Sequence, residues 1–361
     1  MKNITRVGIT TSGGDCQGLN AAIRAVGKAL YEHIENVEIY GMYDGYRGLI
    51  DCDYKFMEPK DFSGIINLGG TILGTSRQLF VPGKDIVDEN GESLLPAMKN
   101  TYNRLNLDCL VVMGGNGTQK SAKLLSDNGM NVVTLPKTID NDIYGTDVTF
   151  GFQSAVDIST NVIDYIHTTA TSHGRIFVVE CMGRDAGWLT LYAGIGSGAD
   201  AILIPEIPYD ITVLTELIAA RKKKGKAFTI IACAEGAVER GNRVLSEEEA
   251  RAKKEAETYS TVGYKLAADL ERITGQDARV VVPGHYQRGG PPCAYDRVLA
   301  TQFGAAAAEL IVRRQYGRMV AMQGGEITSI PLEEAASKTK FLPVDHPMIK
   351  VARDIGICMG D

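Results

Sequence analysis

The sequence predicts an α/β protein in which helices cover parallel β-sheets, and three observations carry that prediction. Short β-rich runs alternate with helical patterns along the 361 residues. The strand-like runs are continuously apolar, as expected when both faces of a strand are buried. Gly-rich motifs follow several of these runs, at the strand ends where such sheets bind ligands. A chain of this length forms either two packed units or one large unit.

The predicted elements follow one another in a regular order. Residues 6–11 form a strand that leads through a Gly-rich turn into a helix at 21–34, and a second strand follows at 37–43. A helix at 95–105 then precedes a strand at 109–115. The remaining predictions are a helix at 153–169 and strands at 131–135, 175–181, 201–204, 227–232 and 279–282, with helical patterns between the later strands. This alternation is typical of strands that lie parallel.

Composition and charge exclude several classes of partner. Hydrophobic residues make up 44% and charged residues 23%, as in ordinary globular proteins, and the net charge of -6 argues against nucleic acid and membrane surfaces. No apolar run approaches the roughly 18 residues of a membrane span, and the first residues do not resemble a secretory signal. The seven cysteines form no C-x-x-C pair, which predicts free thiols in a reducing cytoplasm.

The first Gly-rich turn covers residues 11–20, after the first predicted strand and before the first helix. Glycines let backbone N–H groups approach an anion closely, and the following helix presents the positive end of its dipole. The turn is not a G-x-G-x-x-G fingerprint, because Asp15 stands at the second Gly position. It is not a P-loop either, because Leu19 and Asn20 replace Lys-Ser/Thr. A tight turn without a ligand remains the alternative.

The second Gly-rich turn, at residues 114–118, reads Gly-Gly-Asn-Gly-Thr. Thr118 is expected to cap the helix that follows. Since this turn also follows a predicted strand and precedes a helix, two anion-binding turns are expected at the same sheet edge. Kinases acting on NAD or on diacylglycerol carry a similar turn, so the motif indicates a phosphoryl donor without naming the acceptor.

The segment at residues 136–142 reads Pro-Lys-Thr-Ile-Asp-Asn-Asp and follows another predicted strand. Two carboxylates two residues apart, Asp140 and Asp142, suit a general base beside a group that orients metal or water. An Asx-rich turn explains the same three residues when they are taken alone. The context of the other motifs favours catalysis.

Together, these motifs make the chain similar to the phosphofructokinase family over residues 7–314. Seven motifs occur in the family's order: Thr-Ser-Gly-Gly-Asp at 11–15, Tyr-Asp-Gly-Tyr at 43–46, Gly-Gly-Thr-Ile-Leu-Gly-Thr-Ser-Arg at 69–77, Gly-Gly-Asn-Gly-Thr at 114–118, Pro-Lys-Thr-Ile-Asp-Asn-Asp at 136–142, Met-Gly-Arg at 182–184 and Gly-His-Tyr-Gln-Arg-Gly-Gly at 284–290. Each motif is weak to moderate alone, but all seven in order leave little room for chance.

The resemblance implies a fold of two Rossmann-like lobes with the active site in the cleft between them. A donor lobe of residues 1–150 plus about 287–335 would hold nucleotide and Mg²⁺, and a sugar-phosphate lobe would hold residues 151–286 plus about 336–361. The implied reaction is phosphoryl transfer from ATP to the 1-hydroxyl of fructose 6-phosphate. The implied assembly is a homodimer or homotetramer whose subunits share active sites.

The resemblance also implies donor-side and catalytic roles. Asp140 would take the proton from the sugar hydroxyl, Thr138 would hold that hydroxyl, and Asp142 would support the base and the metal. Arg77 and Arg184 would neutralise charge on the transferring group. The remaining ATP contacts would be Gly14, Tyr46, Gly115, Asn116, Gly117 and Thr118, with Tyr46 packed near the nucleotide and Arg77 shared with the donor site.

On the acceptor side, the family pattern places arginines and a histidine around the sugar 6-phosphate, where the guanidinium fork suits phosphate oxygens. These residues match Arg175, Arg279, His285 and Arg288. In the family, the residues matching Arg175 and Arg279 reach in from a neighbouring subunit. Met182, Gly183 and Glu235 would contact the sugar ring.

Two positions depart from the ATP-dependent pattern. Asn116 stands where Asp usually serves the Mg²⁺ site, and an amide supplies no negative charge. Pyrophosphate users place Asp at the position of Gly117 and Lys at the position of Lys137. The chain combines Gly117, which leaves room for ATP, with Lys137, a mixture that occurs in ATP-dependent relatives of the pyrophosphate branch. ATP is therefore the expected donor.

Several alternatives stay open at the level of the sequence. A pyrophosphate-dependent enzyme and a kinase of another sugar phosphate, such as sedoheptulose 7-phosphate, both fit the motifs. An NAD-type kinase does not require the arginine set, and a non-catalytic homologue need not keep Thr138, Asp140 and Arg184. The family's allosteric site is poorly matched, because His167 and Phe228 replace its Arg and His, so regulation by ADP or phosphoenolpyruvate is not expected to follow the familiar form.

Overall fold

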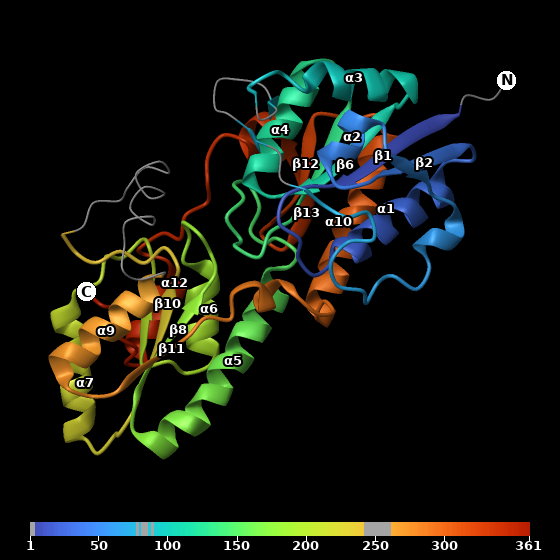
Figure 1. Ribbon diagram of the computed structural model, residues 1–361. Helices are drawn as coiled ribbons and strands as arrows, with labels where there is room; N and C mark the ends of the chain where they lie inside the picture. The colour runs from blue at the N-terminus through green and yellow to red at the C-terminus, as the bar shows by residue number, and fades with distance from the viewer. Residues whose placement is uncertain (1–3, 77–78, 81–85, 88–89, 242–260) are drawn as a thin grey trace. The chain divides into compact units, whose positions relative to one another are not determined.

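The computed structural model describes residues 4–76, 79–80, 86–87, 90–241 and 261–361, and their chain forms two compact units (Figure 1). Unit 1 combines Met1–Ser154 with Arg288–Lys340, and unit 2 combines Ala155–Gln287 with Phe341–Asp361. Each unit contains its own sheet and its own hydrophobic core. The chain therefore leaves unit 1, completes most of unit 2, and contributes to both again before its end.

Unit 1 is built on a seven-stranded sheet with the order β13-β12-β7-β6-β1-β2-β3. Its central strands are parallel, and the outer strands β3 and β13 pair antiparallel with their neighbours. The strands are β1 (Thr5–Thr11), β2 (Val37–Met42), β3 (Tyr54–Phe56), β6 (Cys109–Gly114), β7 (Val132–Pro136), β12 (Arg318–Gln323) and β13 (Glu326–Pro331). A small ladder of β4 (Leu79–Phe80) and β5 (Ile86–Val87) lies outside this sheet. The all-parallel expectation thus holds for the centre of the sheet and fails at its edges.

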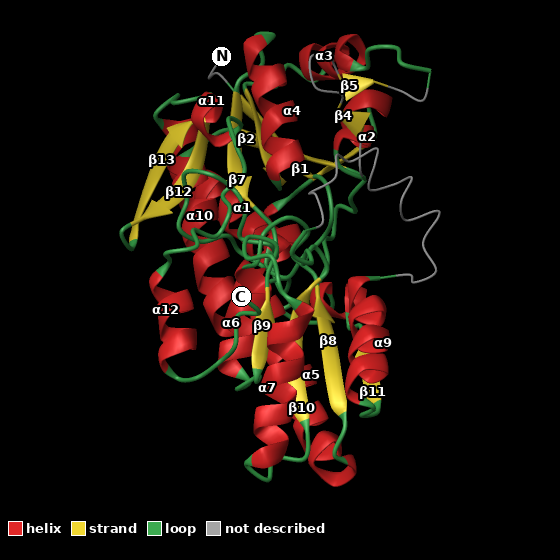
Figure 2. Cartoon of the chain, turned by 90° about the vertical axis from the view of Figure 1, so that its left-hand side faces the viewer, coloured by secondary structure: helices red, strands yellow, loops and turns green. Residues whose placement is uncertain are grey.

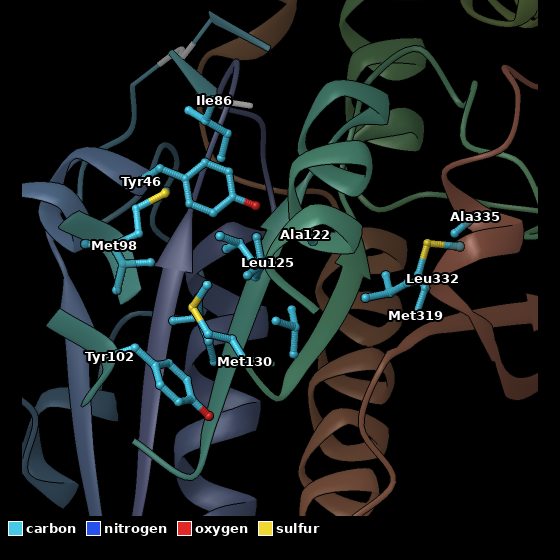
Figure 3. Packing of buried hydrophobic residues seen from close by; sticks show 14 of the residues in the cluster. Tyr46, Ile86, Met98, Tyr102, Ala122, Leu125, Met130, Met319, Leu332 and Ala335 are labelled. Carbon is cyan, nitrogen blue, oxygen red and sulfur yellow. The ribbon is translucent and has the colours of Figure 1, made fainter. Parts of the chain in front are cut away.

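Helices cover both faces of this sheet. Helix α10 packs against α1 and contacts β7 and β12, while α4 packs on β6 and β7. Buried side chains from α3 and α4, such as Met98 and Leu125, join Tyr46 in one apolar cluster (Figure 3). The helical elements are α1 (Leu19–His33), α2 (Tyr46–Asp51), η1 (Pro59–Phe62), α3 (Leu95–Arg104), α4 (Asn116–Asp127), α10 (Ala294–Val312) and α11 (Leu332–Ala335).

Unit 2 is built on a four-stranded parallel sheet with the order β11-β8-β10-β9 (Figure 2). Alternate side chains of these strands face α7 and α9 on one side, whereas Gly194 of α6 approaches Ile202 and Ala232 on the other. The elements are β8 (Ile176–Cys181), β9 (Ala201–Leu203), β10 (Thr229–Ala234), β11 (Ala278–Val281), α5 (Phe152–His173), α6 (Trp188–Gly196), α7 (Ile211–Lys223), α9 (Val262–Thr274), η2 (Gly284–Arg288) and α12 (Pro347–Asp354). Helix α5 begins at the end of unit 1 and continues into unit 2.

The structure differs from the sequence expectations at the second turn. Helix α4 begins at Asn116, and Gly115 precedes it without a side-chain cap. Thr118 therefore lies inside the helix, so its predicted capping role is wrong. Its hydroxyl donates instead to the carbonyl oxygen of Ser12, at 3.5 Å. Among the helices that the structure describes, none is long and apolar enough to cross a membrane.

Candidate active site

Three turns meet at one edge of unit 1 because the strands before them are neighbours. Strands β7, β6 and β1 are adjacent and parallel, so their carboxyl ends lie side by side. These ends lead into the segment at residues 137–142, the turn at 114–118 and the turn at 11–18, respectively. The two Gly-rich turns also precede helices α1 and α4, whose N-terminal N–H groups suit an anion.

The first turn is fixed by contacts with its neighbours. The Ser12 amide donates to the carbonyl oxygen of Met113 at 2.9 Å, and the Gly13 amide donates to that of Ser76 at 3.1 Å. Gly13 has a φ of 83°, a left-handed conformation that side chains rarely adopt. The turn therefore has a defined backbone, which is what close approach to a phosphate requires.

Two cations lie against this first turn. Lys137 is 3% exposed, and its Nζ donates to the carbonyl oxygen of Gly14. Burial lowers the pKa of Lys137, and the positive charge of Arg288 lowers it further. The Arg288 Nη1 donates to the carbonyl oxygen of Asp15 at 3.0 Å. A methyl group at Gly14 would lie 3.1 Å from the same nitrogen. Positive charge is thus concentrated beside the glycines.

The segment after β7 brings the two predicted catalytic carboxylates together with the second turn. The Asp140 amide donates to Thr138 Oγ1 at 3.1 Å. The Asn116 Nδ2 donates to Asp142 Oδ2 at 2.6 Å and to the Asp142 carbonyl oxygen at 3.2 Å. Burial raises the pKa of Asp142 well above its usual range, and the nearby charge of Asp140 adds to that rise. Asn116 and the positive charge of Lys340 oppose it.

The other residues predicted to contact ATP differ in their burial and in their contacts with the second turn. Gly115 and Gly117 belong to the second turn, and a methyl group at Gly117 would meet nothing within 4 Å. Tyr46 is 1% exposed and lies in the apolar cluster, where its hydroxyl donates to the Thr118 carbonyl oxygen at 3.3 Å (Figure 3). Its ring therefore supports the second turn from inside the core, and its expected place near a nucleotide stays a prediction. Arg77 lies outside the described residues.

In unit 2, the Met-Gly-Arg turn follows β8 and is held from two sides. The Glu235 Oε1 accepts hydrogen bonds from the Arg184 amide at 2.8 Å and from the Gly183 amide at 3.3 Å. The Met182 amide donates to the buried Gln287 Oε1 at 3.3 Å. Arg184 adopts a φ of 51°, and its side chain is largely exposed. The turn thus presents a cation from a constrained backbone.

Arg175 and Arg279, which the family pattern assigns to the sugar 6-phosphate, lie at the N-terminal ends of their strands. The Met-Gly-Arg turn follows the carboxyl end of β8. Arg175 precedes β8, and Arg279 is the second residue of β11. Both donate to Asp277 Oδ2, each at 3.0 Å. Since a strand rises about 3.3 Å per residue, roughly 20 Å separates Arg175 from the Met182 turn. Within one chain, Arg175 is therefore far from the Met182 turn, whereas the exposed His285 follows β11.

Comparison with known proteins decides the family. The family model described as Phosphofructokinase matches residues 6–311, most of the chain. The chain belongs to the phosphofructokinase family. A solved relative in this family is the phosphofructokinase of Pichia pastoris in the T-state, with 31% identity and a TM-score of 0.78. The similarity covers 99% of this chain and 37% of that one.

Two curated phosphofructokinases are similar along nearly their whole length. The ATP-dependent 6-phosphofructokinase of Spirochaeta thermophila is 53% identical over 98% of this chain and 97% of its own length. That of Propionibacterium freudenreichii is 46% identical over 99% of both chains. The resemblance predicted from seven short motifs is therefore confirmed over the full chain.

Sequence reasoning missed two polar residues that organise these turns. Gln287 is fully buried and joins Ser159 of α5, the Met182 amide and the Gly284 carbonyl oxygen. It lies inside the motif at 284–290, which could have directed attention to it. Lys340 contacts the segment after Asp140 from nearly 200 positions away. No periodicity or Gly-rich pattern marks Lys340, so only the structure reveals it.

Proposed function

We propose that this phosphofructokinase transfers the γ-phosphoryl group of ATP to the 1-hydroxyl of fructose 6-phosphate, giving fructose 1,6-bisphosphate and ADP. The family match and the names of relatives up to 53% identical support this activity. One observation in the molecule itself carries the proposal. Two Gly-rich turns and the Asp140 segment end three adjacent parallel strands of unit 1, so phosphate-binding N–H groups and a carboxylate share one sheet edge.

In the proposed reaction, the sugar 1-oxygen attacks the γ-phosphorus while its proton passes to Asp140. The bond from the γ-phosphorus to the bridging β-phosphate oxygen breaks, and ADP leaves. Thr138, whose Oγ1 accepts from the Asp140 amide, would orient the hydroxyl. Arg184 and Arg77 would offset the negative charge on the transferring oxygens, which is where phosphoryl transfer needs most help.

The residues beside Asp140 fit a Mg²⁺ ion held partly by the donor. Among the described residues, no three His, Cys, Asp or Glu side chains gather as a metal cluster. Mg²⁺ commonly needs only one or two carboxylates together with substrate phosphates. Asp142 suits this role, because burial and the charge of Asp140 raise its pKa, and a cation would relieve that repulsion. Asn116 would contribute through its amide oxygen. Bound Mg²⁺ would supply charge neutralisation on the β- and γ-phosphates.

For the acceptor, we propose that two copies of the chain complete each site. His285, Arg288, Glu235 and the Met182–Arg184 turn would serve the fructose 6-phosphate bound to their own chain. Arg175 and Arg279 lie at the other end of the unit 2 sheet, where they share Asp277. That location supports their use by a neighbouring copy in a homodimer or homotetramer.

ATP is the proposed donor because of Gly117. A side chain at this position would occupy the space beside the second turn, and Gly117 leaves that space open. Lys137, the residue type shared with pyrophosphate users, donates a hydrogen bond from its ammonium group to the Gly14 carbonyl oxygen.

The seven free thiols also agree with action in a reducing cytoplasm.

The proposed base is tested by Asp140→Ser. Loss of a general base should lower kcat by at least about a hundredfold, with a smaller change in KM. Asp127→Ser, an exposed carboxylate of α4 paired with Lys123, is the matched control and should keep wild-type rates. Formation of fructose 1,6-bisphosphate from ATP and fructose 6-phosphate is the readout. Unchanged kcat in Asp140→Ser would remove Asp140 from this role.

The proposed phosphate contact is tested by Arg288→Ala. Because a 6-phosphate contact is nearly the same in the ground and transition states, its loss should chiefly raise KM for fructose 6-phosphate. Steady-state kinetics with each substrate varied in turn separates this effect from one on ATP. A rise confined to the KM for ATP would instead assign Arg288 to the donor turn, where it contacts Asp15.

A further inference from the structure

A lysine of the returning C-terminal segment holds the loop that follows Asp140. The Lys340 Nζ donates three hydrogen bonds: to Asn141 Oδ1 at 3.1 Å, to the Thr146 carbonyl oxygen at 2.8 Å and to the Asp147 carbonyl oxygen at 3.0 Å. An ammonium group has three donors, so its capacity is filled by this one loop. A side chain with all its protons committed to a loop restricts the loop strongly.

The backbone of the same segment adds to this hold. The Lys340 amide donates to the Asp142 carbonyl oxygen at 2.7 Å. One residue earlier, Thr339 forms an antiparallel bridge with Ile143. Lys340 therefore contacts the loop on both sides of its turn, through its main chain at Asp142 and through its side chain at residues 141–147.

Asn141 lies at the centre of the loop that Lys340 holds. This residue has a φ of 51°, a left-handed conformation that asparagine adopts more readily than other non-glycine residues when its side chain bonds locally. Its side chain is 3% exposed, with Nδ2 donating to the Asp147 carbonyl oxygen at 3.3 Å and Oδ1 accepting from Lys340. Asn141 stands between Asp140 and Asp142, so its conformation sets the directions of both carboxylates.

We infer that Lys340 is a positioning residue for phosphoryl transfer, which fixes the Asp140–Asp142 turn in its working geometry without touching a substrate. This inference rests on the proposed function, because it assigns Lys340 to the turn that carries the proposed base. Small displacements of reacting groups lower rates steeply, so the loss of Lys340 should be felt in kcat more than in substrate binding.

The test compares Lys340→Met with Lys350→Met. Lys350 is an exposed lysine of α12 paired with Asp354, so it controls for loss of a lysine as such. With ATP and fructose 6-phosphate, Lys340→Met should lower kcat at least about tenfold while both KM values stay within about threefold. Lys350→Met should match the wild type. A Lys340→Met chain that does not fold is replaced by Lys340→Gln, judged by the same criteria.

A second readout separates positioning from general damage. If Lys340 acts through the turn at Asp140, then Lys340→Met should change kcat by less than about threefold in an Asp140→Ser background, since the effects of residues that act as a unit are not additive. A purely structural effect would lower kcat by the same factor in both backgrounds, and that result would overturn the inference.

Hydrogen exchange keeps the inference testable if the proposed function itself fails. Amides at residues 141–147 should exchange at least about tenfold faster in Lys340→Met than in Lys350→Met. If the wild type phosphorylates no fructose 6-phosphate, the proposed function is wrong, and exchange alone decides whether Lys340 fixes the loop. Unchanged exchange, or wild-type kcat in Lys340→Met, would overturn the role of Lys340.

Discussion

At the scale of single residues, Gly117 and Asn116 determine what a negative charge in the second turn would interact with. They are adjacent at the start of α4, yet they face different surroundings. Gly117 opens onto free space, whereas the Asn116 amide is committed to Asp142. A negative charge introduced at either position would therefore act on a different partner: the donor phosphates proposed to lie beside Gly117 in one case and the Asp142 carboxylate in the other.

Gly117→Asp should lower the ATP-supported kcat/KM at least about tenfold. Two unit charges about 4 Å apart at an effective dielectric near 20 interact by about 4 kcal/mol, and even part of that exceeds tenfold in binding. Because a methyl group at Gly117 meets nothing, the substitution should not disturb the fold. Gly117→Asn, of equal size without charge, is the control for bulk. An equal loss in both variants would assign the effect to size alone.

Asn116→Asp should make the protein depend on Mg²⁺ for stability. The Asn116 Nδ2 now donates to Asp142 Oδ2 at 2.6 Å, and a carboxylate there would instead face a carboxylate. We expect the melting temperature in EDTA to fall by a few degrees, about 1 kcal/mol, and Mg²⁺ to restore it. Thermal melts with and without Mg²⁺ measure this. A melting temperature that ignores Mg²⁺ would argue against a cation site beside Asp142.

At the scale of elements, the strands that are short apolar runs were predictable, including the edge strands β9 and β11 of unit 2, whereas β3, β12 and β13 of unit 1 were not predicted. Strands β1, β6 and β7 are short apolar runs, and their predicted positions are confirmed to within one or two residues. Strand β13 alternates partly buried and exposed residues, so a search for apolar runs passes over it. The start of α4 was misjudged because a Thr after glycines resembles a cap.

The packing of α1 on α10 depends on a glycine that no local pattern explains. A methyl group at Gly304 would lie 2.6 Å from the Ala25 Cβ and 2.7 Å from the Ala22 carbonyl oxygen. Gly304→Ala should therefore destabilise unit 1 by about 1–3 kcal/mol, although alanine favours helices. Chemical denaturation measures the change. Ala305→Ser, on the exposed face of α10, should cost little. A Gly304→Ala protein as stable as the wild type would contradict this close approach.

At the scale of the whole molecule, the chain combines distant segments in each unit. Residues 318–331 complete the sheet of unit 1, and Cys358 pairs with Ala201 at the edge of the unit 2 sheet. Local sequence patterns do not say which unit a late segment joins, because that choice depends on contacts far along the chain. The expectation of a donor lobe and a sugar-phosphate lobe came from the family resemblance and stays a prediction.

The rate at which cysteines react with a thiol reagent tests the packing of the hydrophobic cores of both units. Cys16 and Cys109 are buried in unit 1, and Cys181 and Cys233 are buried in unit 2. Burial raises the pKa of Cys16 and of Cys181 to about 12, so neither forms much thiolate near neutral pH. Maleimide at pH 8 should therefore label the native protein only at the partly exposed Cys52, Cys293 and Cys358, as mass spectrometry of peptides would reveal. Rapid labelling of Cys181 or Cys233 would contradict the core of unit 2.

Turnover of fructose 6-phosphate, measured with ATP and with pyrophosphate in parallel in the presence of Mg²⁺, tests the proposed function most directly. ATP is the proposed donor because Gly117 leaves open space and because the Lys137 ammonium group is held by the Gly14 carbonyl oxygen. We expect a kcat/KM at least about tenfold higher with ATP, with fructose 1,6-bisphosphate as the product. A kcat/KM higher with pyrophosphate would mean that Lys137 outweighs Gly117, and turnover with neither donor would contradict the proposed function.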